Sequence, residues 1–330
     1  MNNLTPNEAG RLLLEHDGFL VLTHMNPDAD TLGSALALVK TLQSVGKTAR
    51  AVCSDPVPEN RAPLFDGYTF EDDGSPYSYV VTVDVADTTL LGKYESFKGK
   101  IDLMIDHHVL RCPLAENVCV NPKAGACAEV VYDICRLICF ENKTDISSQV
   151  ASYMYAALSA DTGGFIYSNT TSRTHMIASL LLNYDFNPTE INEILHIIKP
   201  EARIRAEAFV ASTMKRVMQG KVASVLMTLA DKEALDCSDE LLGEIVDIPR
   251  SVEGVDIAIS LREKEPGAYK VSLRSRISDV SAVAAVFGGG GHKKAAGCTV
   301  FADDPEKARA MLVAECRKAL KNDLKSDPKE

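Results

Sequence analysis

Short apolar runs alternate with helical patterns through the first half of the chain, and this alternation limits the fold more than any other feature of the sequence. Apolar, β-branched runs of about four to eight residues predict buried strands, whereas apolar residues spaced three and four apart predict helices. The predicted strands are residues 18–23, 50–53, 79–85, 101–105 and 117–120, and the predicted helices are residues 32–45, 126–140, 147–159 and 172–182. This order implies an α/β domain with a doubly wound, mostly parallel sheet.

The pattern changes near residues 187–200. A connecting helix is predicted at residues 201–218, and a smaller α+β domain follows it. Its predicted strands are residues 222–228, 255–262 and 269–274, and its predicted helices are residues 239–246 and 305–320. A length of 330 residues is comfortable for two domains. We therefore expect an N-terminal domain at residues 1–186, a helical linker at 187–218 and a C-terminal domain at 219–330.

The composition excludes several classes of protein. The nine cysteines contain no Cys-x-x-Cys pair, so neither a disulfide framework nor a thiolate zinc site is expected. The apolar runs are too short to span a bilayer, and the N-terminus shows no signal-peptide pattern. We expect a cytoplasmic protein with no membrane partner, and the sequence leaves open whether it forms a homodimer.

The net charge of −11 limits the ligands further. Long nucleic acids are held through their phosphates by a broad basic surface. A chain this acidic is not expected to offer one, which argues against long duplex DNA as a partner. An anionic substrate must instead be attracted by charge concentrated at one place.

The first group of candidate ligands follows the strand predicted at residues 18–23. It contains His24, Asp28 and Asp30, directly before the next predicted helix. In open α/β sheets, ligands bind outside the carboxyl ends of the strands. Local structure explains the same residues equally well, with Asp30 as a helix N-cap and Asp28 as a turn former.

Two further groups follow the next internal strands. Asp84 lies inside an apolar run, where an aspartate is costly unless its charge is compensated, whereas Asp87 fits an ordinary turn. Asp106, His107 and His108 follow the strand predicted at residues 101–105. The chain has seven histidines, so an adjacent pair after an aspartate at a strand end is unusual.

A fourth group, Asp161-Thr162-Gly163-Gly164, ends a predicted helix. The glycines allow a sharp turn and a close approach of the backbone to a ligand, although a plain helix stop explains them as well.

Taken together, the four groups favour a metal site. Three of them end strands that share one edge of a parallel sheet, so their side chains are expected to converge. Gathered carboxylates repel one another unless cations hold them, and two divalent metals would offset four such charges. Imidazole and carboxylate donors suit manganese, magnesium or iron better than a structural zinc.

These motifs resemble the DHH phosphoesterase superfamily. Its four N-terminal motifs have counterparts here, in order, as His24-x-x-x-Asp28-x-Asp30, Asp84, Asp106-His107-His108 and Asp161-Thr162-Gly163. In the second half, residues 288–297 (GGGGHKKAAG) and 271–275 (VSLRS) resemble the glycine-rich signature and the arginine-bearing strand of the DHH-associated C-terminal domain. The resemblance covers nearly the whole chain.

The resemblance implies roles for individual residues. The implied ligands are His24, Asp28 and Asp84 for one metal, and Asp30, Asp84, His107 and Asp161 for the other. His108 is left to bind phosphate or to protonate the leaving oxygen, and Asp106 orients the histidines. The cofactor expected is a pair of divalent ions, with Mn²⁺ favoured and Mg²⁺ as the alternative.

Substrate binding is expected in the second domain. The glycine run exposes backbone N–H groups that can cradle an anion, and Arg274 can hold a phosphate through two parallel bonds. His292 is a further candidate. A flexible linker is the alternative explanation of the run, but a predicted helix at residues 280–287 and a strand-like segment flank it. The glycines concerned are Gly289, Gly290 and Gly291.

Within the superfamily, the two-domain length resembles the short oligoribonucleases that also act as phosphatases on pAp (adenosine 3′,5′-bisphosphate). Asn121-Pro122 and residues 128–132 (AEVVY) resemble the same subgroup. The implied substrates are very short RNA (nanoRNA), linear dinucleotides such as pApA, and pAp. The alternatives are a cyclic di-AMP phosphodiesterase and a nucleotide-binding regulator without catalysis, although the full ligand set argues against the regulator. Some relatives carry an arginine where this chain has Phe165-Ile166-Tyr167, so substrate contacts there are not transferred.

Overall fold

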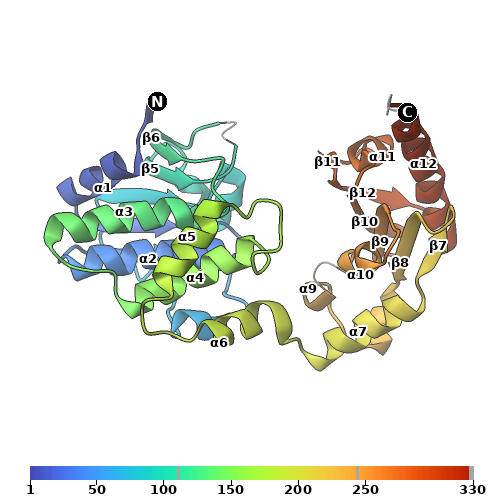
Figure 1. The fold of residues 1–330 in the computed structure, drawn as a ribbon, viewed down its shortest axis with the longest axis horizontal. Helices are drawn as coiled ribbons and strands as arrows, with labels where there is room; N and C mark the ends of the chain where they lie inside the picture. Colours follow the sequence, from blue (N-terminus) through green and yellow to red (C-terminus); the bar gives the residue numbers. More distant parts are fainter. Residues whose placement is uncertain (110–111, 243–244, 327–330) are drawn as a thin grey trace. The chain divides into compact units, whose positions relative to one another are not determined.

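The chain forms two compact units in a computed structural model that describes residues 1–109, 112–242 and 245–326. The first unit is Met1–Ile198 and the second is Lys199–Glu330 (Figure 1). The helix and strand labels of Figure 1 are used below, and each unit is described by itself.

The first unit contains a six-stranded sheet in the order β1-β6-β5-β4-β2-β3. Every neighbouring pair is parallel, which confirms the predicted sheet. Strands β2 to β6 were visible as apolar runs because a parallel sheet is buried on both faces, whereas β1, two exposed asparagines, was not predicted. They are β1 Asn2–Asn3, β2 Phe19–Leu22, β3 Ala49–Val52, β4 Tyr79–Val83, β5 Ile101–Asp106 and β6 Ala115–Val120.

Helices cover one face of this sheet (Figure 1). Helix α2 is almost wholly buried and packs against both α3 and α4. Gly33 makes the close approach to α4 possible, since a Cβ at this position would lie 2.6 Å from the Tyr153 carbonyl oxygen. The helices are α1 Pro6–Glu15, α2 Ala29–Ser44, α3 Cys127–Asn142, α4 Ser148–Asp161, α5 Ser172–Leu181 and α6 Pro188–Asn192, with shorter turns η1 Ala62–Phe65 and η3 Glu193–Ile197.

The other face of the sheet is covered by the 3₁₀ segment η2 (Thr88–Phe97) rather than by α-helices. Its side chains Leu91 and Tyr94 join a cluster with Leu20, Val80 and Met104 from the strands. The two faces therefore carry separate apolar clusters, and the carboxyl edge of the sheet lies between them.

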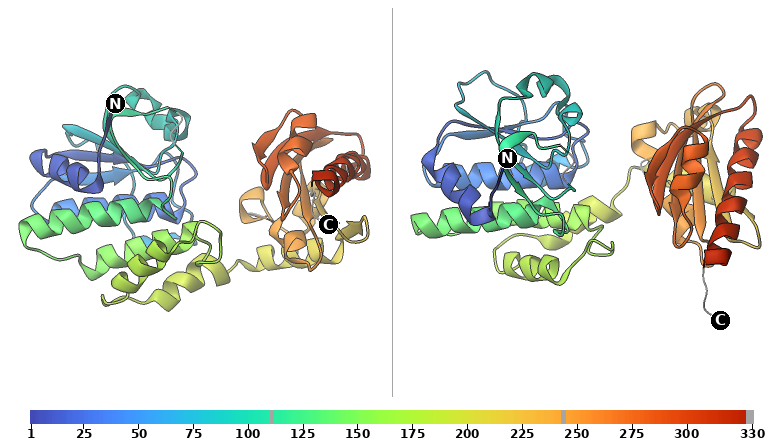
Figure 2. Two further views of the ribbon diagram at one scale, coloured as in Figure 1. Left: turned by 45° about the horizontal axis from the view of Figure 1, so that its top comes forward. Right: turned by 90° about the horizontal axis from the view of Figure 1, so that it is seen from above.

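The second unit contains a six-stranded sheet in the order β11-β12-β10-β9-β8-β7. Only the pairing of β8 with β9 is parallel among its described strands. Helices α11 and α12 pack on one face, and α12 runs along the sheet in red in Figure 2. The strands are β7 Lys215–Val217, β8 Val222–Met227, β9 Ile257–Glu265, β10 Ala268–Ser275, β11 Gly290–His292 and β12 Ala295–Phe301. The helices are α7 Glu201–Ser212, α8 Leu229–Ala234, α9 Asp239–Leu242, α10 Asp247–Ser251, α11 Val280–Val286 and α12 Pro305–Ser326.

The helix predicted at residues 201–218 was wrong in its last third. Helix α7 ends at Ser212, and Lys215–Val217 forms β7, which pairs with β8 as a hairpin. Met218, Gln219 and Gly220 all have positive φ in the turn between them. Three such residues close a tight reversal and cannot continue a right-handed helix.

Among the described residues, no helix has the length and apolar character needed to cross a bilayer.

Candidate metal centre

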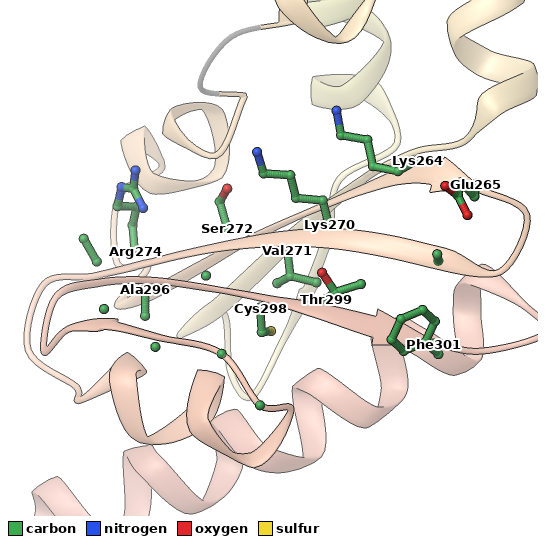
Figure 3. A pocket seen from close by; sticks show the side chains of 17 residues that line it. Lys264, Glu265, Lys270, Val271, Ser272, Arg274, Ala296, Cys298, Thr299 and Phe301 are labelled. Carbon is green, nitrogen blue, oxygen red and sulfur yellow. The ribbon is translucent and has the colours of Figure 1, made fainter. Parts of the chain in front are cut away.

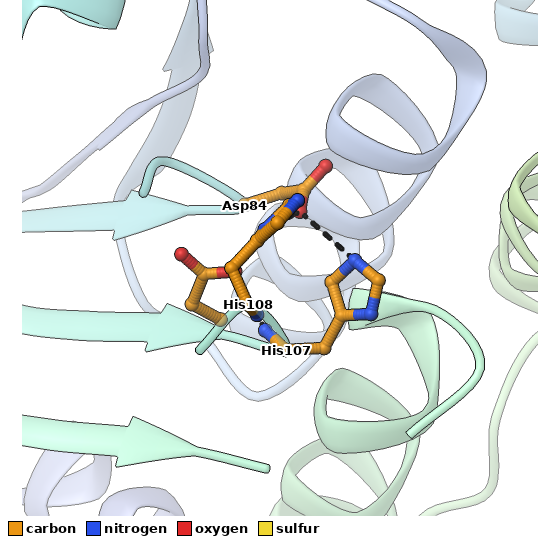
Figure 4. Close-up of side chains that lie close together, drawn as sticks. Asp84, His107 and His108 are labelled. Carbon is orange, nitrogen blue, oxygen red and sulfur yellow. Dashed lines mark hydrogen bonds and ion pairs between the residues drawn. The ribbon is translucent and has the colours of Figure 1, made fainter. Parts of the chain in front are cut away.

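The candidate metal centre lies at the carboxyl ends of β2, β4 and β5, which are neighbours in the sheet. His24 comes two residues after β2, Asp84 follows β4 directly, and Asp106 is the last residue of β5. Figure 4 shows Asp84, His107 and His108 beyond these strand ends. This is where open α/β sheets bind ligands.

Asp84 lies at the middle of the site. Its backbone has a φ of 60°, in the left-handed region, and its N–H donates to the Ile105 carbonyl at 2.9 Å. One carboxylate oxygen, Oδ2, lies 3.7 Å from His24 Nε2, and the other, Oδ1, lies 3.6 Å from His107 Nε2. The side chain is 3% exposed, and Oδ1 is buried without a hydrogen-bond partner. A buried oxygen in this state is costly unless a cation binds it.

His24 and Asp28 approach Asp84 from the end of β2. His24 Nδ1 lies 2.8 Å from the Met25 carbonyl oxygen, so this nitrogen is the donor and Nε2 is left facing Asp28 Oδ1 at 3.7 Å. Asp28 is also the N-cap of α2, because its Oδ1 accepts from the N–H groups of Asp30 and Thr31 at 2.9 and 3.1 Å. The interpretation of Asp30 as the N-cap is therefore wrong.

Asp30, His107 and Asp161 form the opposite side of the site. His107 Nε2 lies 3.6 Å from Asp161 Oδ2 and 4.0 Å from Asp30 Oδ2. Asp30 is fully buried and accepts hydrogen bonds from Ser34 Oγ at 2.9 Å and from the Cys127 N–H at 2.7 Å.

Asp106 holds the histidine pair in place. Its Oδ1 accepts from the His107 N–H at 2.6 Å and the His108 N–H at 3.0 Å, and it lies 2.8 Å from His108 Nδ1. His108 is about half exposed, at 51% of its side chain, whereas Asp106 is fully buried. Asp106 therefore holds the backbone of both histidines and the ring of His108, whose second nitrogen, Nε2, lies outside this hydrogen bond.

The potential ligand atoms of these residues gather into three overlapping groups. Within each group they lie within 4.8 Å of one another. The groups are His24, Asp28 and Asp84; Asp30, His107 and Asp161; and Asp84, Asp106, His107 and His108. The structure thus brings together all eight residues that the sequence suggested for metal binding and catalysis in the first unit.

Electrostatics favour cations in this site. Burial, followed by the charges of neighbouring aspartates, raises the pKa of Asp30 and of Asp84 well above its ordinary value. Burial also raises the pKa of Asp161. For Asp106, burial acts upward but the hydrogen bonds with His108 outweigh it and lower the pKa. A divalent ion would stabilise the charged form of every carboxylate here.

The donors available are nitrogen and oxygen. The nearby Cys127 is buried, and burial raises the pKa of its thiol well above the ordinary value, so it stays protonated. Imidazole and carboxylate donors without a thiolate fit Mn²⁺, Mg²⁺ or Fe²⁺. The residues present therefore fit a pair of such ions.

One short segment, residues 124–128, contacts two of these side chains, His107 and Asp30, and the sequence did not reveal it. The Ala124 carbonyl oxygen lies 3.2 Å from His107 Nδ1, and the Cys127 N–H binds Asp30. Asn169 completes the connection, since its Nδ2 donates to the Gly125 carbonyl at 2.8 Å and to the Asp161 carbonyl at 3.0 Å. We name residues 124–128 with Asn169 the ligand clamp.

Glu129 supports the ligand clamp from behind. It is 1% exposed, and its Oε1 accepts from the Gly125 N–H at 3.0 Å and from Thr174 Oγ1 at 2.6 Å. Its position in residues 128–132 had been noted only as a subgroup resemblance. The only signal in the sequence was an acidic residue in an otherwise apolar helical turn.

Four of the candidate substrate residues of the second unit, Arg274 and the three glycines, line one hollow of about 870 Å³, and His292 lies outside its lining (Figure 3). Arg274 on β10 and His292 on β11 both pair with Ala295 of β12, one from each side. Gly289 has no room for a side chain, because a Cβ would lie 2.2 Å from the Gly297 carbonyl oxygen, whereas a Cβ on Gly290 would meet open space. Gly291 completes the run.

Comparison with known proteins agrees with this geometry. Residues 18–158 match the DHH family, N-terminal domain, and residues 218–321 match the DHHA1 domain. The chain is 31% identical, over 305 residues, to the bifunctional oligoribonuclease and PAP phosphatase NrnA of Thermus thermophilus, covering 91% of this chain and 89% of that protein. The chain belongs to the DHH family.

Two further proteins match this chain over nine-tenths or more of their own length. The chain is 28% identical to the probable bifunctional oligoribonuclease and PAP phosphatase NrnA of Streptococcus mutans, covering 87% of this chain and 90% of that protein. An exopolyphosphatase-related protein from Bacteroides fragilis shares its fold, with a TM-score of 0.82 and 24% identity over 95% of this chain and 96% of that chain.

Proposed function

We propose that this DHH-family hydrolase cleaves short oligoribonucleotides and linear dinucleotides such as pApA to mononucleotides, and converts pAp to AMP. The observation that carries the proposal is the gathering of the eight site residues into three overlapping groups, within each of which the potential ligand atoms lie within 4.8 Å of one another. Support also comes from relatives named as oligoribonucleases and PAP phosphatases, which this chain matches over about nine-tenths of its length.

Two divalent ions, with Mn²⁺ preferred over Mg²⁺, are proposed to bind the two ligand sets that meet at Asp84. When bound, such ions activate water at neutral pH and polarise a phosphoryl oxygen. His24 and Asp28 would hold one ion, and Asp30, His107 and Asp161 the other. Each histidine presents Nε2 to the site because its Nδ1 is held by a backbone carbonyl.

His108 is proposed to act on the substrate rather than on metal. Its Nδ1 is occupied by Asp106, and this hydrogen bond raises the pKa of the imidazole. A half-exposed imidazole that favours its protonated form can hold a phosphate oxygen or give a proton to the leaving oxygen. Asp106 keeps the ring oriented and itself stays ionised.

The second unit is proposed to bind the substrate away from the cleaved bond. Arg274 and His292 lie in one row across the sheet, beside the glycine run. A guanidinium, an imidazole and exposed backbone N–H groups together suit a phosphate. This local concentration of donors compensates for the net charge of −11.

The test is a substrate panel. Purified chain with Mn²⁺ should release mononucleotides from an RNA dinucleotide and from pApA, and AMP from pAp. Asp84→Asn should abolish release, because both ligand sets lose the charged carboxylate that they share. Asp87→Asn is the matched control, because exposed Asp87 caps η2 through the Thr89 N–H and asparagine caps equally well. Lack of turnover of every linear substrate by metal-loaded protein would refute the proposal, and faster turnover of cyclic di-AMP than of pApA would favour the alternative activity.

A further inference from the structure

Over β10 and β12, one face of the sheet in the second unit is open to solvent, whereas over β8 helices α7 and α9 cover it. Along β10 and β12, residues alternate between a buried side and an exposed side. The buried side packs against α11 and α12. The other side carries Lys270, Ser272 and Arg274 on β10 and Gly297, Thr299 and Phe301 on β12. Figure 3 shows Lys270, Ser272 and Arg274 in a line along β10.

The antiparallel register arranges these residues in rows across the two strands. Arg274 pairs with Ala295 at one end, Lys270 pairs with Thr299 in the middle, and Ala268 pairs with Phe301 at the far end. Rows on one face are two residues apart, or about 7 Å, so the whole face is about 20 Å long. The Arg274 end already has a proposed phosphate site. The rest of the face is long enough to hold further nucleotides of an extended single strand.

Lys270 provides a positive charge in the middle of this face. It is exposed and has no ion-pair or hydrogen-bond partner among the described residues that would occupy its ammonium group. Lys264, in contrast, lies 2.8 Å from Asp239 Oδ2 and is neutralised there. Lys270 is therefore the cation available to a phosphate between the two ends.

Phe301 offers an aromatic ring at the far end. Its side chain is 73% exposed, which is unusual for a large apolar residue that has a whole sheet face beside it. Glu265, which pairs with Ala268 in the same row, is the one carboxylate among the described residues lining this hollow. Its charge disfavours a phosphate there, so this end suits an uncharged base.

We propose that this open face binds single-stranded RNA beyond the nucleotide held at Arg274, with a phosphate on Lys270 and a base stacked on Phe301. The inference rests on the proposed function, which it deepens by giving oligonucleotides longer than two residues additional binding contacts that dinucleotides and pAp lack. Stacking accepts any base, because every base has a π-face. The face therefore selects by length rather than by sequence.

The test compares fluorescently labelled RNA of two and five nucleotides binding to the full chain in EDTA, where turnover is absent. Phe301→Ala should weaken binding of the pentanucleotide by about tenfold, the effect of losing one stacked base. Met311→Ala is the matched control, since Met311 is an exposed apolar residue on α12, which packs on the opposite face of the sheet. Equal pentanucleotide affinity in the two variants would overturn the inference.

Two further measurements separate charge from stacking. Lys270→Ala should reduce the slope of log K against log salt by about 0.7, the value for one phosphate contact with a single strand, whereas Phe301→Ala should leave the slope unchanged. Inorganic polyphosphate has no bases, so its binding should respond to Lys270→Ala and not to Phe301→Ala. Equal weakening of polyphosphate and RNA by Phe301→Ala would contradict stacking.

Failure of the proposed function gives a different result from failure of this inference. If wild-type chain with Mn²⁺ cleaves no linear substrate but Phe301→Ala still weakens pentanucleotide binding, the proposed function fails and the open face stands. If dinucleotides are cleaved but the ratio of kcat/KM for pentanucleotide over dinucleotide is the same in wild type and Phe301→Ala, the open face fails and the proposed function stands.

Discussion

Asp84→Asn should stabilise the metal-free protein, although it destroys the metal centre. In the absence of metal, the Asp84 carboxyl is buried, one oxygen has no hydrogen-bond partner, and four other aspartates act on its charge. Leaving such a group unsatisfied costs about 1–3 kcal/mol. Asparagine removes the charge, keeps the shape and tolerates the left-handed backbone at this position. Alanine would add backbone strain and confuse the result.

The expected change in melting temperature follows from these energies. For a unit of this size, about 1 kcal/mol corresponds to about 2–4 °C, so the variant should melt about 2–12 °C above wild type in EDTA. Metal should reverse the order. An ion at a hundred times its Kd adds about 2.7 kcal/mol of stability, and two ions should therefore raise the wild-type midpoint by about 10–20 °C while leaving Asp84→Asn nearly unchanged.

Differential scanning calorimetry with EDTA and with Mn²⁺ measures both effects. Asp87→Asn again serves as control and should follow wild type in both conditions. If Asp84→Asn melts below wild type in EDTA, Asp84 is not a repelled, unsatisfied group, and the electrostatic reasoning is refuted.

Three other predictions follow from the packing and the charges. Asn169→Ala should weaken the affinity for one of two metal ions by about 10- to 100-fold, because the ligand clamp loses its link to Asp161. Isothermal titration calorimetry should show this change in one binding step. The control variant Asn183→Ala, at an exposed position, should show no change. Gly33→Ala should lower the free energy of unfolding by about 1–3 kcal/mol, because the new Cβ meets a backbone oxygen. An unchanged melting temperature would show that α2 and α4 can move apart to accept it. Burial raises the pKa of three ligand aspartates, so their contribution to metal-free stability is fully present below the ordinary aspartate pKa and is lost as pH rises through the raised values. The gain in melting temperature from Mn²⁺ should therefore grow as the pH rises above the ordinary aspartate pKa, and proton release should accompany binding.

Much of the first unit could be predicted from the sequence, for a physical reason. Strands buried on both faces are continuous apolar runs, and the predicted strand at residues 79–85 differs from β4 only at its end. Helix α1 was not predicted, yet its signal is local: Thr5 and Glu8 form a capping box, with Pro6 at the first position. The β7 hairpin was missed because the helical pattern of α7 continues into it.

The sequence predicted the charged residues of the site, but it did not predict the residues that hold them in place. Asp84 and the histidine pair are unusual where they stand, at the ends of apolar strands. Asn169 has no such signal, because it lies in a loop and acts on Gly125, 44 residues away. Contacts of that kind depend on tertiary structure, which a single sequence does not display.

Manganese anomalous scattering from crystals grown with Mn²⁺ tests the central claim most directly. The account predicts two peaks about 3.5–4 Å apart, one bonded to His24, Asp28 and Asp84 and the other to Asp30, His107 and Asp161, with Asp84 within reach of both. A single peak, or ions bound only at acidic residues elsewhere, would contradict it.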